Sequence, residues 1–125
     1  MKLRTGLTAN ADLVVTAQDT AVALGSGDVP VLGTPRVVAL AEAATVAAVA
    51  SVLPEGRTTV GTRVEVRHEA PTPLGRRVEA VAILVGVDGR RLTFDVTVRD
   101  GETVLATAVV ERVVVDRDRF LEAAG

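Results

Sequence analysis

Aromatic side chains are almost missing from this chain, and that shortage limits its possible partners. The 125 residues include two phenylalanines but neither tryptophan nor tyrosine, and the formal net charge is −2. Proteins that hold single-stranded nucleic acid stack the bases on aromatic rings and attract the phosphates with basic groups. The sequence therefore predicts no nucleic-acid partner and a core built from Val, Ala and Leu.

Cysteine is absent altogether. Its absence excludes disulfides, zinc–thiolate sites and a thiol nucleophile, and it fits a reducing compartment. The first ten residues contain no apolar segment of the signal-peptide type. The longest apolar run, residues 37–53, carries Glu42, and a carboxylate inside a bilayer would cost roughly 2.5 to 3.5 kcal/mol. We therefore expect a cytoplasmic protein with no membrane partner.

One long helix is predicted by residues 33–54, which read GTPRVVALAEAATVAAVASVLP. Apolar side chains occupy nearly every side of this helix, so we expect it to be covered on most sides. Thr34 followed by Pro35 is a common helix start, with the threonine as N-cap. A short extended segment and a turn-rich loop, residues 25–35, precede the helix.

Strands are predicted after Pro54 and Gly56, where the apolar period changes from 3.6 to 2. We expect four of them, at about residues 58–70, 77–87, 91–99 and 103–115, with Asp-Gly turns at 88–89 and 100–101. The alternation places one set of side chains on the inner face of the first strand and another on the inner face of the third: Val60, Thr62, Val64, Val66 and His68, then Leu92, Phe94, Val96 and Val98.

The predicted order is an extended segment, a loop, one long apolar helix and a four-strand antiparallel meander. A helix that is apolar nearly all round can be covered only if the sheet curls about it. This is the α+β hotdog fold, a curved antiparallel sheet wrapped around one long central helix. We expect residues 1–125 to form a single hotdog domain, of a kind that usually pairs into a homodimer with the ligand channel along the subunit interface.

Glu42 is a candidate catalytic residue because it is a carboxylate in an otherwise apolar helix. Such a group is either paired with an opposite charge or strongly affected by desolvation, and both situations suit a general base or a nucleophile. Two structural alternatives stay open. The side chain lies on a solvent-facing strip of the helix, or it makes a hydrogen bond at a dimer interface.

His68 and Thr34 are the other candidates. A lone histidine on an apolar face is more often a hydrogen-bonded core residue, but His68 ends its strand, where a side chain can face a cleft. Its ordinary pKa near 6.5 suits proton transfer. The default role of Thr34 is to cap the helix. About 12 Å of helix separates Thr34 from Glu42, so the two residues need a curled loop or a bridging substrate to cooperate. A helix start would also offer backbone N–H groups to a developing oxyanion.

Most of the chain, about residues 7–120, resembles the fluoroacetyl-CoA thioesterase-like family of hotdog proteins. The spacing of the candidate threonine, glutamate and histidine matches the family's catalytic set without a gap. The matching features are Gly33-Thr34 before the helix, Glu42 eight residues later, the strand VGTRVEVRHEAPTPLG with Gly61 and His68, and the downstream segments GRRLTFDVTVRDG and ERVVV.

The resemblance implies hydrolysis of a short-chain acyl-CoA thioester, with Thr34, Glu42 and His68 as catalytic residues. It also implies that Gly33 and Gly61 contact the substrate. In that scheme Glu42 is the nucleophile or activates water, Thr34 positions the carboxylate or the thioester, and His68 handles the proton. An acyl-enzyme intermediate and direct attack by water both stay open. The scheme needs no metal and no cofactor.

The loop before the helix departs from the family's fluoroacetyl enzyme, which closes its pocket with phenylalanines there. Here that loop reads GSGDVPVLG, and the only phenylalanines are Phe94 and Phe120. A short acyl group other than fluoroacetyl is therefore expected. The phosphates of CoA call for basic groups, although arginines that alternate with glutamates more often form a solvated face. The candidates are Arg36, Arg63, Arg67, Arg76, Arg77, Arg90 and Arg91.

Two other functions compete with hydrolysis. A non-catalytic hotdog protein that binds acyl-CoA or a small apolar ligand has no need of the three polar residues together. A hydratase acting on enoyl-CoA usually pairs an Asp and a His close in sequence, whereas the aspartates here lie mainly in turns and in residues 115–125. That C-terminal segment is expected to form a helical turn or to fray.

Overall fold

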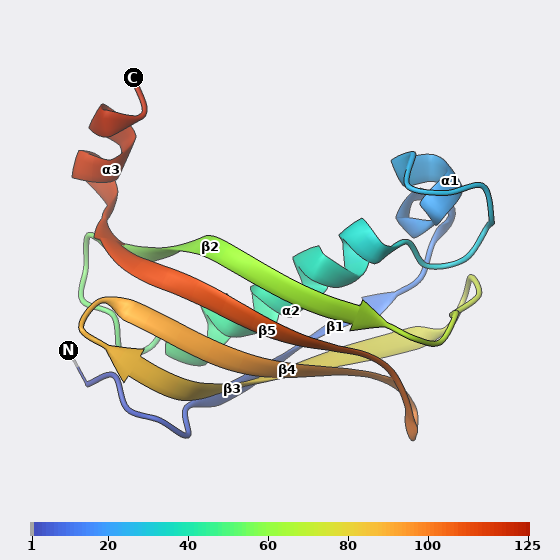
Figure 1. Cartoon of the computed structure of the whole chain (residues 1–125), viewed down its shortest axis with the longest axis horizontal. Coiled ribbons are helices and arrows are strands. Elements are labelled where there is room, and N and C mark those ends of the chain that lie inside the picture. The colour runs from blue at the N-terminus through green and yellow to red at the C-terminus, as the bar shows by residue number, and fades with distance from the viewer. Residues whose placement is uncertain (1) are drawn as a thin grey trace.

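The architecture is given by a computed structural model that describes residues 2–125. Five strands, three α-helices and one 3-10 helix follow one another along this part of the chain (Figure 1). Their bounds are β1 (Thr8–Val14), η1 (Ala17–Asp19), α1 (Ala21–Leu24), α2 (Thr34–Val49), β2 (Arg57–His68), β3 (Arg77–Asp88), β4 (Arg91–Asp100), β5 (Thr103–Asp116) and α3 (Arg117–Ala123).

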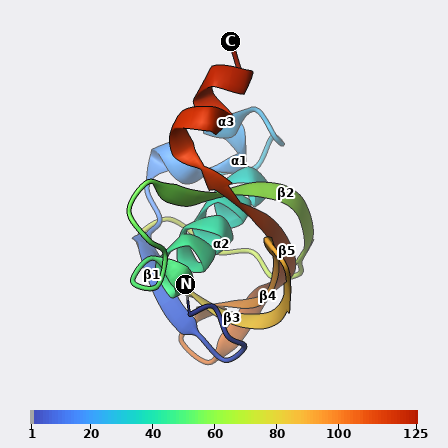
Figure 2. The same cartoon turned by 90° about the vertical axis from the view of Figure 1, so that its left-hand side faces the viewer.

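The strands form one antiparallel sheet in the order β1-β3-β4-β5-β2. Figure 2 shows this sheet curling around α2, so the predicted α+β hotdog architecture is confirmed. The predicted meander of four strands is wrong in one pairing. β1 occupies the outer edge of β3, so β2 pairs with β5 at the opposite end of the sheet. Both β1 and β2 are therefore edge strands.

The core lies between α2 and the inner face of the sheet. Leu92, Phe94, Val96 and Val98 all point inward from β4 and are almost completely buried, as the alternation predicts. The helix contributes small and medium apolar residues, among them Val37, Leu40, Ala41, Ala44, Ala48 and Val49. Phe94 supplies the only aromatic ring in this core, so the packing of the core depends on many aliphatic contacts.

One side of α2 is not covered by the sheet, contrary to the expectation that the helix is enclosed on most sides. The exposed residues are Ala39, Ala43, Val46, Ala47 and Ala50. We call this the α2 stripe. In Figure 2 the sheet leaves α2 open between its two edge strands. An apolar stripe of this kind is unusual on the surface of a monomer.

A bulge in β2 changes which residues face the helix. Gly61 lies opposite Arg112, and Arg63 lies opposite Glu111, so Thr62 is an extra residue without its own partner. Thr62 is consequently exposed, and Val60 does not pack against the core, so the prediction for these two residues is wrong. Beyond the bulge the predicted face is correct. Val64 and Val66 pack against the core, and His68 is half-buried.

Two short helices, η1 and α1, lie in the segment that the sequence predicts as extended, and the predicted loop follows them. Backbone hydrogen bonds run from Ala21 N to Val31 O, from Leu32 N to Thr72 O and from Gly33 N to Asp19 O. These bonds fix residues 25–33 against α1 and against the segment that follows β2. At the other end of the chain, the helical alternative for the C-terminal segment is confirmed by α3. No helix within residues 2–125 has both the length and the apolar character needed to cross a bilayer.

The buried leucine of β4 provides a test of this core. Leu92 is fully buried, so Leu92→Ala is expected to lower the free energy of unfolding by about 2 to 5 kcal/mol, since it removes apolar contacts and leaves a cavity. Leu74 is 47% exposed, and Leu74→Ala is a matched control expected to change it by about 0.5 kcal/mol or less. Urea denaturation at one protein concentration measures both, and equal losses would contradict the assigned core.

Candidate active site

Thr34 is placed at the start of α2 but does not cap it. The N-cap is Gly33, whose extended backbone (φ −82°, ψ 144°) precedes the helix, and Thr34 and Pro35 are the first helical residues. The prediction of Thr34 as N-cap is therefore wrong by one residue. The reason is that the Gly33 amide is held by the Asp19 carbonyl, which fixes the turn into the helix one position earlier. This leaves the Thr34 hydroxyl available for another role.

The Thr34 hydroxyl contacts His68, the last residue of β2. Thr34 Oγ1 lies 2.8 Å from His68 Nδ1. When the hydroxyl donates this hydrogen bond, the neutral imidazole carries its own proton on Nε2. His68 Nε2 is buried and has no protein partner among residues 2–125. We refer to these two residues as the Thr34–His68 pair.

Burial also shifts the protonation of this histidine. Desolvation lowers the pKa of His68 below its ordinary value of 6.5, and a backbone hydrogen bond at Ala70 opposes that shift without reversing it. The imidazole is therefore neutral near pH 7. A neutral imidazole in contact with a hydroxyl can accept its proton, which is the arrangement that activates a hydroxyl nucleophile.

A pocket of about 330 Å³ opens beside the Thr34–His68 pair. Both residues line it, and its remaining walls come from α1, from residues 26–33 and from residues 69–71. Several of these wall residues are apolar, including Ala21, Val29, Val31, Leu32, Ala70 and Pro71. Neither phenylalanine is among them, because Phe94 is in the core and Phe120 is on α3.

A larger groove of about 750 Å³ crosses the sheet over β2, β5 and β4. Charged and hydroxyl side chains such as Glu65, Arg67, Asp95 and Thr97 line it, and it contains neither Thr34 nor His68. Volume alone does not identify a reactive site, so the smaller pocket with the hydroxyl–imidazole contact is the better candidate.

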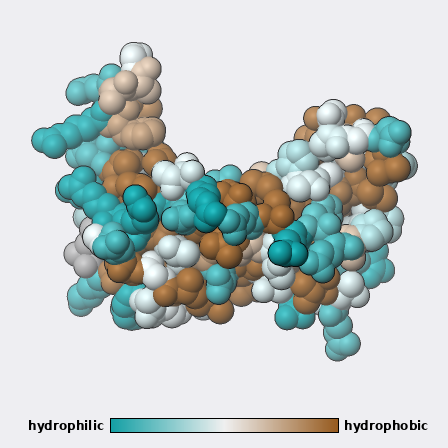
Figure 3. Space-filling model, viewed as in Figure 1, coloured by the Kyte–Doolittle hydropathy of each residue, from teal (hydrophilic) through white to brown (hydrophobic). Residues whose placement is uncertain are grey.

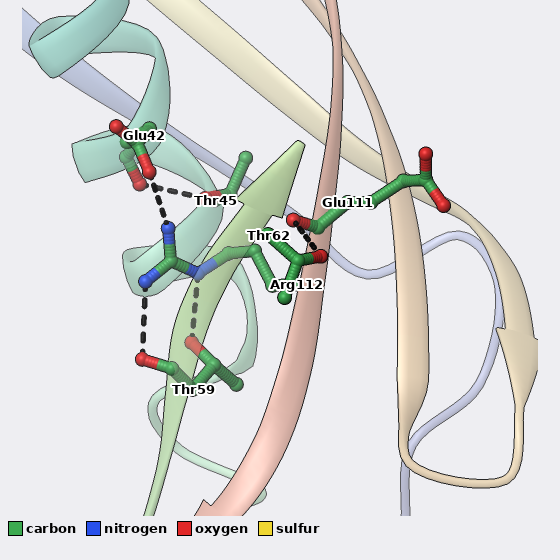
Figure 4. Close-up of polar contacts among 6 residues, drawn as sticks. All are labelled: Glu42, Thr45, Thr59, Thr62, Glu111 and Arg112. Atoms are coloured by element: carbon green, nitrogen blue, oxygen red, sulfur yellow. Dashed lines mark hydrogen bonds and ion pairs between the residues drawn. The ribbon is translucent and has the colours of Figure 1, made fainter. Parts of the chain in front are cut away.

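Glu42 is held by a different partner. Its Oε2 lies 3.0 Å from Nη1 of Arg112, a residue of β5 whose side chain is only 8% exposed. Arg112 also donates to the Thr59 hydroxyl (2.9 Å) and to the Thr59 carbonyl (3.1 Å), as Figure 4 shows. These bonds fix the guanidinium, and the guanidinium in turn fixes the carboxylate. We refer to these residues as the Glu42–Arg112 pair.

Sequence reasoning did not single out Arg112, although a signal for it exists. In β5 the inward residues alternate as Ala108, Val110, Arg112 and Val114, and all four are buried. An arginine at an inward position of an otherwise apolar strand needs a buried partner, because its charge is retained under all ordinary conditions. The carboxylate in the apolar helix is the complementary signal.

Gly61 makes room for the Glu42–Arg112 pair. A Cβ atom at this position would lie inside van der Waals contact with Glu42 Oε2 and 3.2 Å from Arg112 Nη1. Gly33 has a different requirement, since a Cβ there would lie 3.0 Å from Leu24 Cδ1 and 3.1 Å from the backbone of Ala21. Gly33 thus permits close packing against α1 and also lines the smaller pocket.

The three predicted catalytic residues therefore divide into two groups within one chain. Thr34 and His68 meet directly, whereas Glu42 lies two helical turns, about 12 Å, along α2 from Thr34 and contacts Arg112 instead. The helix start offers few free amides for an oxyanion. Pro35 has no N–H, and the amides of Arg36 and Val37 both donate to the Gly33 carbonyl, which leaves the Thr34 amide.

The arginines considered for CoA are in part already paired within the chain. Arg36, Arg63, Arg76 and Arg77 each form an ion pair with a carboxylate, of Asp19, Glu65, Asp100 and Asp12 respectively, and Arg63 also pairs with Glu111. Within β2, Arg63 and Glu65 thus form an ion pair on the outer face. Among residues 2–125, no group of three or more His, Asp or Glu side chains is arranged to hold a metal ion.

A family model and a known relative both match most of this chain. Residues 15–118 match the family model described as fluoroacetyl-CoA-specific thioesterase. A fluoroacetyl-CoA thioesterase from Streptantibioticus cattleyicolor is 38% identical over 90 residues, which cover 72% of this chain and 65% of that protein, so the match spans slightly less than two thirds of that relative.

Solved structures are similar over nearly the whole chain. The structure of a fluoroacetyl-CoA thioesterase superposes with a TM-score of 0.92 at 32% identity, covering 99% of this chain and 96% of that one. A mutant of the fluoroacetyl-CoA-specific thioesterase, solved in complex with fluoroacetate and CoA, gives a TM-score of 0.87 at 33% identity, covering 94% and 99%. This chain therefore belongs to the fluoroacetyl-CoA-specific thioesterase family.

Proposed function

We propose that this protein is an acyl-CoA thioesterase that hydrolyses a short-chain acyl-CoA with Thr34, Glu42 and His68. The observation that carries the proposal is the 2.8 Å contact between Thr34 Oγ1 and His68 Nδ1 beside a small apolar pocket. A hydroxyl hydrogen-bonded to an imidazole is the minimal apparatus for acyl transfer. Family membership and the CoA complex of a relative support CoA as the thiol half of the substrate.

The first half of the reaction uses the Thr34–His68 pair. His68 Nδ1 takes the proton of the Thr34 hydroxyl while Oγ1 attacks the thioester carbonyl carbon. The C–S bond then breaks, and the proton on the imidazole passes to the departing thiolate. CoA leaves as the thiol, and the acyl group remains as an ester on Thr34.

The second half returns the threonine to its free form. A water molecule gives a proton to His68 Nδ1 and attacks the ester carbonyl carbon. The C–O bond to Thr34 then breaks and the proton on the imidazole passes to Oγ1, so the products are the carboxylic acid and the free enzyme. We assign to Glu42, which Arg112 orients, the role of holding this water, and the distance of about 12 Å along α2 requires the bound substrate to lie between Glu42 and Thr34. The catalytic groups in this scheme are all side chains of the protein, and the only other reactants are the thioester and water.

The acyl group is proposed to be short and different from fluoroacetyl. The pocket beside Thr34 has a volume of about 330 Å³, and several of its wall residues are apolar but none is a phenylalanine. Such a pocket discriminates between acyl chains by only about 1 to 3 kcal/mol per methylene. We further propose that residues 1–125 act as one catalytic domain within a homodimer, in the cytoplasm.

Removing the Thr34 hydroxyl tests the proposal directly. Thr34→Val keeps the shape of the side chain, and turnover is expected to fall by about 10²- to 10⁴-fold, since the nucleophile is lost. Thr34→Ser keeps a hydroxyl and is expected to retain activity. The measurement is thiol release from acetyl-, propionyl-, fluoroacetyl- and benzoyl-CoA. Binding of acyl-CoA without turnover by the wild type would identify a non-catalytic binding protein instead.

The pH dependence tests the role of His68. The unprotonated imidazole is the reactive form, and burial lowers the pKa of His68. The rate of thiol release is therefore expected to fall as the pH drops through a midpoint below 6.5. His68→Ala should lose this limb together with most of the activity. A wild-type limb centred above 6.5 would contradict the assignment of His68 as the base.

Gly61 offers a test of Glu42 that leaves both charged groups in place. Gly61→Ala places a methyl group too close to Glu42 Oε2, so the carboxylate must shift and kcat is expected to fall by about 10- to 100-fold. Gly86→Ala is the matched control. Gly86 is also a strand glycine at a register shift, but a Cβ there meets Thr93 at an ordinary 3.5 Å. Equal activities of the two variants would remove Glu42 from the reaction.

A further inference from the structure

A pocket rich in arginine lies at the far end of β2 from the Thr34–His68 pair. Its volume is about 340 Å³, and its walls come from the start of β2, the β3–β4 turn, the end of β5 and α3. The lining residues are Arg57, Arg90, Val115, Asp116, Arg119 and Phe120. We call this hollow the α3 pocket.

The α3 pocket is well separated from the Thr34–His68 pair within one chain. Figure 1 shows α3 and α1 at opposite ends of the molecule, with β2 running between them. The strand extends for 12 residues, from Arg57 to His68, which corresponds to about 35 to 40 Å. The α3 pocket therefore belongs to neither group of the proposed catalytic residues.

The backbone holds together the segments that carry these arginines. The amide of Arg117 donates to the Gly56 carbonyl over 2.9 Å, which fixes the start of α3 against the start of β2. The amide of Val114 donates to the Arg90 carbonyl over 2.9 Å, which fixes the β3–β4 turn against β5. The pocket is thus formed by the fold itself and does not depend on contacts between the arginine side chains.

The positive charges of the α3 pocket are not balanced within the chain. Among residues 2–125, no carboxylate lies within ion-pairing distance of Arg57, Arg90 or Arg119. Asp116 is the only acidic residue of the lining, and its Oδ1 accepts from the Arg119 amide at 3.1 Å. Like charges gathered in this way repel one another, and a bound anion relieves that repulsion. Guanidinium groups bind phosphate oxygens especially well.

An aromatic ring lines the same pocket. Phe120 is 44% exposed, whereas Phe94, the only other aromatic residue of the chain, is fully buried in the core. A flat apolar ring at the surface is a platform on which a nucleobase stacks. In Figure 3 the projection formed by α3 carries hydrophilic and apolar side chains next to one another. A ligand that matches both features has a phosphate and a planar ring.

Another hollow with two arginines, over β3 and β4, lacks this combination. It has a volume of about 320 Å³ and is lined by Arg77, Glu79, Arg99 and Gly101. Arg77 is already paired with Asp12, the glutamate supplies a negative charge, and no aromatic ring is present in the lining. The unbalanced charge and the exposed ring therefore distinguish the α3 pocket from a hollow that merely contains arginines.

We infer that the α3 pocket binds a nucleotide, with Arg57, Arg90 and Arg119 around the phosphates and Phe120 against the base. This goes beyond the proposed hydrolysis, because none of the proposed catalytic residues takes part. A free nucleotide and the nucleotide end of CoA share the same chemistry. The separation of the α3 pocket from His68 of the same chain favours the free nucleotide.

Calorimetric titration of the whole chain with ADP tests the arginines. ADP is expected to bind, and adenosine, which has no phosphate, to bind about 10-fold more weakly or less. Arg119→Ala and Arg90→Ala should each weaken ADP binding by roughly 10- to 100-fold, because each removes charged hydrogen bonds to phosphate. Arg117→Ala and Arg91→Ala are the matched controls, since both residues are exposed neighbours outside the lining. Equal losses in the variants and their controls would overturn the inference.

The role of the ring is tested on the same helix. Phe120→Ala is expected to lower the affinity for ADP by roughly 5- to 100-fold through lost stacking. Leu121→Ala is the control, because Leu121 is 61% exposed and does not line the pocket. Inorganic phosphate should bind more weakly than ADP to the wild type. If phosphate binds as tightly as ADP, or if Phe120→Ala binds ADP like the wild type, the assignment of a nucleotide site is wrong.

Competition with CoA identifies the source of the nucleotide. For a free nucleotide, CoA does not displace ADP, and Arg119→Ala keeps the wild-type KM for acetyl-CoA in the thiol-release assay. For the nucleotide end of CoA, CoA displaces ADP, and Arg119→Ala raises the KM with kcat unchanged. Either result supports nucleotide binding, whereas a wild type that binds neither ADP nor CoA refutes it. ADP binding needs no turnover, so a protein that releases no thiol but binds ADP contradicts only the proposed function.

Discussion

The single extra residue in β2 is the constraint on which the arrangement of polar groups depends. Gly61 and His68 are separated by seven positions, so in a regular strand they would face opposite sides of the sheet. The bulge at Thr62 shifts the alternation, and both residues face α2 as a result. Glu42 can then lie over Gly61 while His68 reaches Thr34 at the start of the same helix. Without the bulge, one of the two contacts would be lost.

Arg112 is the other half of this arrangement. Burying a guanidinium is unfavourable unless its hydrogen bonds are satisfied and an opposite charge is near. Thr59 supplies two acceptors and Glu42 supplies the charge. The missing side chain of Gly61, directly opposite Arg112, provides the space. Such an ion pair contributes little net stability compared with apolar packing, so its presence in a core of Val, Ala and Leu is better explained by the fixed position of the carboxylate.

The sequence predicts the regular parts of this fold and fails where tertiary contacts decide. Alternation alone identifies the inward face of β4, with Leu92 and Phe94, because β4 has a strand on each side and the extra residues at its two register shifts belong to β3 and β5. It cannot reveal the bulge in β2, which depends on the pairing of Gly61 with Arg112. The pairing of β2 with β5 is likewise set by β1, whose edge position follows from contacts distant in sequence.

The candidate site shows the same limits. Thr34, Glu42 and His68 can be selected by type and spacing, and the rise of a helix already separates Thr34 from Glu42. The partner that each acquires cannot be predicted in this way, because it depends on how β2 and β5 pack against α2. Thr34 is read as an N-cap from the Thr-Pro pair alone. Only the bond from the Gly33 amide to the Asp19 carbonyl shows that the helix begins one residue earlier. The alternation of inward and outward residues along β5, by contrast, does indicate that Arg112 points inward.

The loop over the smaller pocket has a consequence for how proteins of this type diverge. Residues 26–33 supply much of the wall, whereas the Thr34 hydroxyl and the His68 imidazole, the proposed reacting groups, belong to α2 and β2. The side chains of the loop can therefore be replaced during evolution without moving this hydroxyl and imidazole. Relatives with nearly superimposable backbones can then differ in the acyl group they accept. Proteins that inherit the same sheet and helix therefore need not share the same metabolic role.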